Sequence, residues 1–137
     1  KEDIIWSNQE RKETIMTKDM VEEIVKRYPY IIRAVKEGRD AAVFSIGNRK
    51  MRIAVGEETK AVCSIIEEIR EREKDRYILK MIEGLKRGES DVAIIQKVAW
   101  ERNAYYERKK RFIEKIYKCC IGRHMVAYED FLAEEIQ

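Results

Sequence analysis

Apolar residues recur every three or four positions along most of the chain, which is the spacing of an amphipathic helix. The first such stripe follows Thr17, a residue type that caps helix N-termini, and consists of Met20, Val21, Ile24, Val25 and Tyr28. Pro29 interrupts this pattern, because it lacks a backbone N–H and disfavours helix at the residue before it. A shorter stripe then runs to Gly38, which is suited to end a helix. The sequence therefore predicts a helix, a kink and a short second helix.

A pattern typical of β-structure follows at residues 42–55. Two short apolar runs, Val43–Ile46 and Met51–Val55, flank Gly47-Asn48, a pair that tolerates the positive φ of a tight turn. The sequence predicts a β-hairpin here. Because an isolated hairpin is only marginally stable, it must pack on the helices or on a second copy of the chain. We therefore assign residues 1–56 to an N-terminal helical region that contains the hairpin and serves packing or dimerisation.

Helical spacing returns after the hairpin and continues over residues 57–87. Two apolar stripes there are separated by Arg70–Arg76, a run without any apolar residue. The segment is either one long helix that crosses solvent or two helices that meet near Lys74–Asp75. Gly88 follows a basic last turn and is a good helix stop, and Ser90 is placed to cap the short helix that comes next.

A longer basic helix is predicted at about residues 102–118, after the turn Ala99-Trp100-Glu101. Helix, glycine turn, short helix, tight turn and basic helix is the order of a helix-turn-helix, whose second helix lies in the major groove of DNA. We place this motif at about residues 76–118, within a helical region at 57–137. The acidic tail is expected to form one last helix, whose apolar residues would be Tyr128, Phe131, Leu132 and Ile136.

These elements predict a mainly α fold, a helical bundle with a C-terminal helix-turn-helix and one short β-hairpin. The 137 residues are 45% hydrophobic and 40% charged, with one proline and six glycines, which excludes collagen and most small all-β folds. The sequence has neither a run of about 20 apolar residues that could span a membrane nor an apolar N-terminal run of the signal-peptide type. Three cysteines, an odd number, favour reduced thiols in a cytoplasm.

Candidate catalytic and metal-binding residues are few. Cys63, Cys119, Cys120 and His124 could supply zinc ligands, but vicinal cysteines are awkward ligands and the sequence has no C-x-x-C pair. No nucleophile is placed beside His124, and no nucleotide-binding or metalloprotease motif is present. We therefore expect no enzyme, no bound metal and no other cofactor.

The distribution of charge is more informative than the total, which is only +3. Residues 97–123 contain nine basic and three acidic residues, a local net charge of +6, whereas the rest of the chain carries −3. A basic block on an otherwise acidic chain is typical of a surface that binds a polyanion. Because this block coincides with the predicted second helix of the helix-turn-helix, duplex DNA is the expected partner.

A helical wheel divides the basic helix into two faces. Tyr105, Phe112 and Ile116 lie within about 20° of one another and are expected in the core, with Ile113 beside them. Asn103, Tyr106 and Lys110 form a line on the opposite side, where a recognition helix meets base edges; asparagine suits adenine and lysine suits guanine. The predicted DNA-binding residues are Lys97, Arg102, Asn103, Tyr106, Glu107, Arg108, Lys110, Arg111 and Lys118.

Three short groups, Glu101-Arg102, Tyr105-Tyr106 and Glu114-Lys115-Ile116, occupy the places of a family motif. The motif reads short helix, small turn, S-E-R-x-x-Y and a basic helix that ends in A-x-x-K-[IL]. Through it, residues 75–119 resemble the sigma-factor region-four type of helix-turn-helix, and more closely the phage and prophage transcriptional regulators of the ArpU and RinA type. The resemblance implies control of late-gene transcription in a bacterial host cell, by binding promoter DNA and contacting RNA polymerase.

The sequence departs from that family at two points. Trp100-Glu101 stands where a serine or threonine N-cap is usual, so the turn needs Trp100 to pack it, and Glu107 would repel phosphate unless it accepts a hydrogen bond from a cytosine amino group. A small terminase-like DNA-packaging subunit is one alternative function. Another is a protein-interaction module, whose basic helix pairs with an acidic partner or with the chain's own tail, Glu129–Glu135. Dimerisation, and a role of the hairpin as a DNA-contacting wing, stay open.

Overall fold

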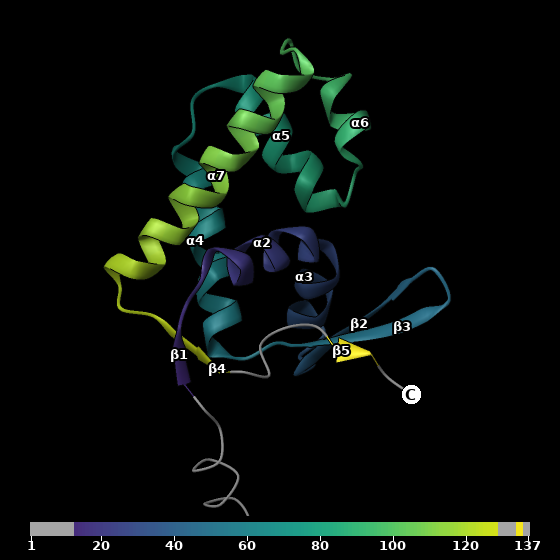
Figure 1. Ribbon diagram of the computed structural model, residues 1–137, viewed down its shortest axis with the longest axis vertical. Coiled ribbons are helices and arrows are strands. Elements are labelled where there is room, and N and C mark those ends of the chain that lie inside the picture. The colour runs from purple at the N-terminus through teal and green to yellow at the C-terminus, as the bar shows by residue number, and fades with distance from the viewer. Residues whose placement is uncertain (1–12, 129–133, 136–137) are drawn as a thin grey trace, which may run out of the picture.

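A computed structural model describes residues 13–128 and 134–135 of the chain (Figure 1). Helices make up most of it, with one prominent β-hairpin, which confirms the predicted mainly α fold class. The elements in chain order are β1 (Glu13–Ile15), α2 (Lys18–Lys26), α3 (Tyr28–Lys36), β2 (Ala41–Ile46), β3 (Arg49–Ala54), α4 (Glu57–Arg72), α5 (Arg76–Arg87), α6 (Asp91–Ile95), α7 (Arg102–Gly122), β4 (Val126–Tyr128) and β5 (Glu134–Glu135).

The predicted helix, kink and second helix are present as α2 and α3. The Thr17 side chain accepts a hydrogen bond of 3.2 Å from the backbone N–H of Met20 and so caps α2. Arg27 separates the two helices, and Pro29 lies in the first turn of α3, where its missing N–H costs nothing. The apolar faces of both helices are buried in the core.

The hairpin is formed by β2 and β3, as predicted. Ala42 pairs with Ile53 and Phe44 with Met51, and these four side chains are buried on one face of the hairpin. Gly47 adopts a φ of +58° in the turn, a conformation that favours glycine. Tyr30 of α3 stacks on Phe44 with ring centroids 5.1 Å apart, so the base of the hairpin packs on the helices, while its turn extends away from them (Figure 1).

The prediction of a last helix in the acidic tail is wrong where the structure describes the tail. Tyr128 belongs to β4, which pairs antiparallel with β1, and Glu134–Glu135 form β5, which pairs with Met51 and Arg52 of β3. The tail therefore adds strands to two small sheets and, at Glu134–Glu135, lies on the hairpin and not on the basic helix. Phe131, Leu132 and Ile136 of the predicted helix lie outside the described residues.

The segment 57–87 consists of two helices, the second of the two predicted alternatives. α4 ends at Arg72, and α5 begins after Asp75, whose carboxylate accepts hydrogen bonds from the N–H groups of Tyr77 and Ile78. Gly88 ends α5 in the left-handed conformation with a φ of +78°, and Ser90 caps α6. Gly88 therefore ends one helix and Ser90 begins the next at the positions that the sequence predicts.

α5, α6 and α7 follow in the predicted order, and α7 continues to Gly122, four residues beyond the predicted end at 118. Its predicted core stripe is buried: the exposed fraction is 0% for Tyr105 and Ile116, 6% for Phe112 and 9% for Ile113. These side chains join one hydrophobic cluster that also includes residues of α2, α3, α4 and the hairpin. α7 runs along α4 and past α2 (Figure 1), so one core supports both the hairpin and α7.

Candidate nucleic-acid interface

α6 is fixed to α7 by a carboxylate at its first position. Asp91 accepts a 2.6 Å hydrogen bond from the Tyr105 hydroxyl and a 2.9 Å hydrogen bond from Lys109 Nζ. Burial raises the pKa of Asp91, but the hydrogen bonds from Tyr105 and Lys109 outweigh it, so its pKa is lower than usual. Asp91 is therefore charged at neutral pH and holds the N-terminal half of α7 against α6.

α6 is also fixed to α5, through a glycine in the middle of α5. Gly84 is buried, and a Cβ at this position would lie 2.7 Å from Cγ1 of Ile94, a side chain that is 1% exposed. Only glycine lets the Ile94 side chain lie so close to the backbone of α5 without a shift. The angle between α5 and α6, and through Asp91 the placement of α7, depends on this contact.

Trp100 packs the turn before α7, as the missing cap requires. Glu101 is the N-cap residue, and its side chain makes no capping hydrogen bond with the described part of the chain. The Trp100 ring instead meets Tyr77 of α5 edge to face, with centroids 6.4 Å apart, and carries Arg108 of α7 over its face at 4.8 Å. The indole thus links α5, the turn and α7, which replaces the missing cap as a constraint on the direction of α7.

The structure brings eight of the nine predicted DNA-binding residues together on α7. Lys97 lies outside this group, in the turn after α6, where its Nζ is 2.8 Å from Glu89. Arg108 is half-buried against Trp100. The others are exposed: Arg102, Asn103, Tyr106, Glu107, Lys110, Arg111 and Lys118.

The exposed face of α7 keeps most of its positive charge. Arg111 Nε lies 3.8 Å from Glu107, but both side chains are largely exposed (71% and 60%), and such surface pairs contribute little energy. Arg102 stands 5.7 Å from the ring of Tyr106, a contact that leaves its charge unneutralised. Glu107 is thus the one acidic side chain among the predicted contacts, and Arg111 partly offsets it.

The N-terminus of α2 borders this face on one side. Lys18 Nζ hydrogen-bonds Glu114 of α7 at 3.3 Å and lowers the pKa of that carboxyl. A groove between the two helices is lined by Tyr106 and Lys110 from α7 and by Asp19 and Glu22 from α2. Lys110 therefore stands at the edge of the exposed face beside two acidic residues, whereas Asn103 lies one turn before this groove begins.

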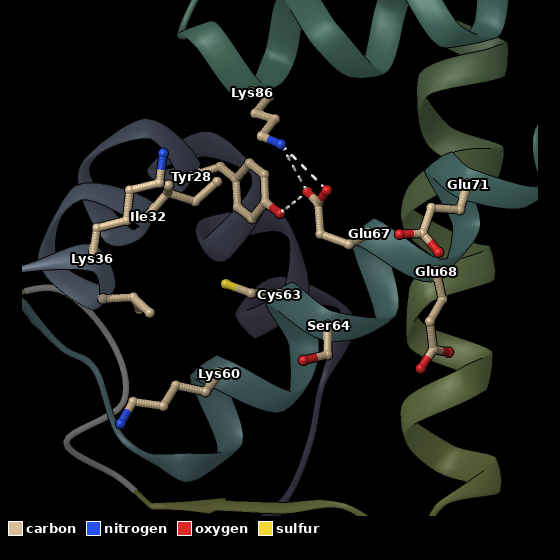
Figure 2. A pocket seen from close by; sticks show the side chains of 11 residues that line it. Tyr28, Ile32, Lys36, Lys60, Cys63, Ser64, Glu67, Glu68, Glu71 and Lys86 are labelled. Carbon is tan, nitrogen blue, oxygen red and sulfur yellow. Dashed lines mark hydrogen bonds and ion pairs between the residues drawn. The ribbon is translucent and has the colours of Figure 1, made fainter. Parts of the chain in front are cut away.

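A cavity of about 500 Å³ lies elsewhere, between α3, α4 and α5 (Figure 2). Glu67, which lines this cavity, accepts hydrogen bonds from the Tyr28 hydroxyl at 2.7 Å and from Lys86 Nζ at 3.2 Å. Burial raises the pKa of Glu67, yet these hydrogen bonds, with one from Arg70, lower it overall. The cluster ties three helices together, because Tyr28 belongs to α3, Glu67 to α4 and Lys86 to α5.

The thiol in this cavity is a poor nucleophile. Burial, with a smaller effect of the Glu67 charge, raises the pKa of Cys63 to about 12, so the thiol stays protonated at neutral pH. Within residues 13–128 and 134–135, no group of three or more His, Cys, Asp or Glu side chains could hold a metal ion. In the same described part of the chain, no helix is long and apolar enough to cross a membrane.

Comparisons with known proteins add no family to this picture. The chain matches no protein-family model, no curated protein and no solved structure.

Proposed function

We propose that this chain is a sequence-specific, double-stranded DNA-binding transcriptional regulator, and that α7 is its recognition helix. One observation carries the proposal: the helix with the basic block presents an exposed polar face, while its opposite face is locked to α5 and α6 by Asp91, Trp100 and the core. A rigid helix with a basic exposed face, preceded by a short helix and a turn, is the arrangement that major-groove recognition uses.

The roles of the side chains follow from their chemistry. Asn103 pairs with adenine and Lys110 with guanine, and Glu107 accepts a hydrogen bond from a cytosine amino group. The remaining basic residues on the face bind backbone phosphates, which fix the position of the helix but do not specify a sequence. These are Arg102, Arg108, Arg111 and Lys118.

The resemblance to phage and prophage regulators supports the biological setting that we propose. In that setting the protein acts in the cytoplasm of a bacterial host, at a promoter of late genes, in contact with RNA polymerase. A homodimer would place two copies of α7 on a two-fold symmetric site.

The experiment is a fluorescence-anisotropy titration of two labelled duplexes at two or more salt concentrations. One duplex carries the region upstream of the protein's own operon, and the other is a scrambled sequence of the same composition. Tight, salt-sensitive binding with a preference for the first duplex supports the proposal. Equal and steeply salt-dependent binding of both favours a packaging role, and no binding of either at low salt refutes DNA binding and leaves a protein partner.

Point variants separate base contacts from phosphate contacts. Asn103→Ala or Lys110→Ala should reduce discrimination between the two duplexes by about 1–3 kcal/mol per lost base contact. Arg108→Ala or Arg111→Ala should weaken binding of both duplexes alike and flatten the salt dependence. If all four variants bind both duplexes as the wild type does, the face that we assign to DNA is wrong.

A further inference from the structure

Aromatic rings hold three cations, two beside the proposed recognition helix and one on it. Arg76 Cζ and Lys80 Nζ of α5 lie 4.8 and 5.6 Å from the centroid of the Tyr77 ring, and Arg76 also donates a 3.0 Å hydrogen bond to the Tyr77 hydroxyl. Arg108 of α7 lies 4.8 Å from the centroid of Trp100. Because Tyr77 and Trp100 contact each other, the three cations belong to one continuous surface, which we call the aromatic shoulder.

The cations of the aromatic shoulder keep their full charge. Within residues 13–128 and 134–135, none of the three forms an ion pair with a carboxylate. A ring positions a cation without neutralising it, whereas a carboxylate partner neutralises one, as Glu89 does for Arg87. A cluster of positioned but unneutralised cations is suited to an anionic partner.

The two acidic residues just before Arg76, Glu73 and Asp75, are turned toward the backbone. Glu73 accepts hydrogen bonds from the N–H groups of Lys74 and Asp75, and Asp75 caps α5 through Tyr77 and Ile78. Both carboxylates therefore hold the α4–α5 connection in shape. Lys74, Arg76 and Lys80 remain exposed around them.

The aromatic shoulder adjoins the exposed face of α7. Arg108, Arg111 and Lys115 of α7 line one side of a shallow cavity, and Glu73 and Ile78 line the other. The N-terminus of α5 therefore flanks α7 on the side opposite to α2, which borders the groove at Lys110. If α7 lies in the major groove of a duplex, one of the two DNA backbones passes over the N-terminus of α5.

We propose that the aromatic shoulder is a second DNA-contact surface, in which Arg76 and Lys80 bind backbone phosphates beside the groove that α7 reads, and Tyr77 and Trp100 position them. The inference rests on the proposed function and extends it to residues outside α7. The occupant is duplex DNA and not a free anion, because the cations are spread over two helices and do not converge on one point.

The test compares salt dependence in two charge-matched double variants. Arg76→Gln/Lys80→Gln removes one arginine and one lysine from α5, and Arg33→Gln/Lys36→Gln removes the same two residue types from the exposed face of α3. Each phosphate contact contributes about 0.9 to the slope of log K against log salt concentration. We expect the α5 variant to lose up to about 1.8 from the slope, which is roughly 60-fold in affinity between 1 M and 0.1 M salt, while the α3 variant changes little.

Two further variants test the positioning role of the ring. Tyr77→Leu removes the ring and Tyr77→Phe keeps it. The slope of log K against log salt concentration should therefore fall in Tyr77→Leu and stay at the wild-type value in Tyr77→Phe. Discrimination between the specific and the scrambled duplex should stay at the wild-type value in all four variants, since phosphate contacts carry no sequence information. Equal unfolding midpoints for the Leu and Phe variants would show that the difference in slope does not come from lost structure.

Each outcome decides the inference. An unchanged slope in Arg76→Gln/Lys80→Gln, with sequence-specific binding intact, overturns the aromatic shoulder and leaves the proposed function standing. An equal fall in the α3 control overturns it as well, because net charge alone would then explain the effect. If the wild-type protein binds no duplex at low salt, both the inference and the proposed function fall.

Discussion

Gly84→Ala is the substitution whose effect the structure predicts in most detail. Alanine in place of glycine inside a helix stabilises it by about 1 kcal/mol. The new Cβ would, however, lie 2.7 Å from Cγ1 and 3.0 Å from Cδ1 of Ile94. Ile94 is 1% exposed and so cannot turn out into solvent, and overpacking of a buried side chain costs about 1–3 kcal/mol. The two effects together predict a net loss of up to about 2 kcal/mol.

The sign of the effect should reverse when Ile94 is shortened. In an Ile94→Ala background the clashing atoms are absent, so Gly84→Ala should stabilise the protein by up to about 1 kcal/mol. Urea unfolding followed by circular dichroism measures both backgrounds, and an unchanged m value would show that the denatured state is the same. If Gly84→Ala destabilises the protein equally in both backgrounds, the close approach of α5 and α6 is not the reason for this glycine.

Two further predictions concern the polar clusters. Tyr105→Phe removes the 2.6 Å hydrogen bond to Asp91, so it should lower stability by about 1.5 kcal/mol. Because α6 is then held less firmly on α7, the affinity for specific DNA should fall more than the affinity for nonspecific DNA. Equal losses of both affinities in anisotropy titrations would contradict this. The lowered pKa of Glu67 means that its charged form stabilises the fold above its ordinary pKa and that this contribution is lost as the pH falls through the lowered value. The stability difference between wild type and Glu67→Gln should therefore shrink on acidification, and a constant difference in urea titrations from pH 7 to pH 3 would refute it.

Local sequence signals predicted the helical elements well. Thr17 and Ser90 cap helices, and Gly88 ends one, through contacts within a few residues of each position. The core stripe of α7 follows from helical periodicity alone. Such features depend on neighbours along the chain, so a single sequence contains the information needed to place them.

Features that depend on distant partners were not predictable in this way. β1 pairs with β4 across more than a hundred residues, and β5 pairs with β3, so the tail forms strands although its own periodicity favours a helix. The aromatic shoulder likewise requires Tyr77 and Trp100 to meet, and helical wheels of separate segments contain no sign of that contact. The sequence signal nearest to this surface was the run Arg70–Arg76, which has no apolar residue and whose last member, Arg76, belongs to the aromatic shoulder.

The length of α7 explains how one helix can serve both the core and a ligand surface. Its C-terminal half is anchored by Ile116 and Cys120, both fully buried against the scaffold. Its N-terminal half depends on fewer contacts, chiefly the Asp91 cluster and the Trp100 ring, and carries the residues that we assign to base recognition. Substitutions near Cys120 should therefore act mainly on stability, whereas Tyr105→Phe acts on both stability and the orientation of the DNA-facing half.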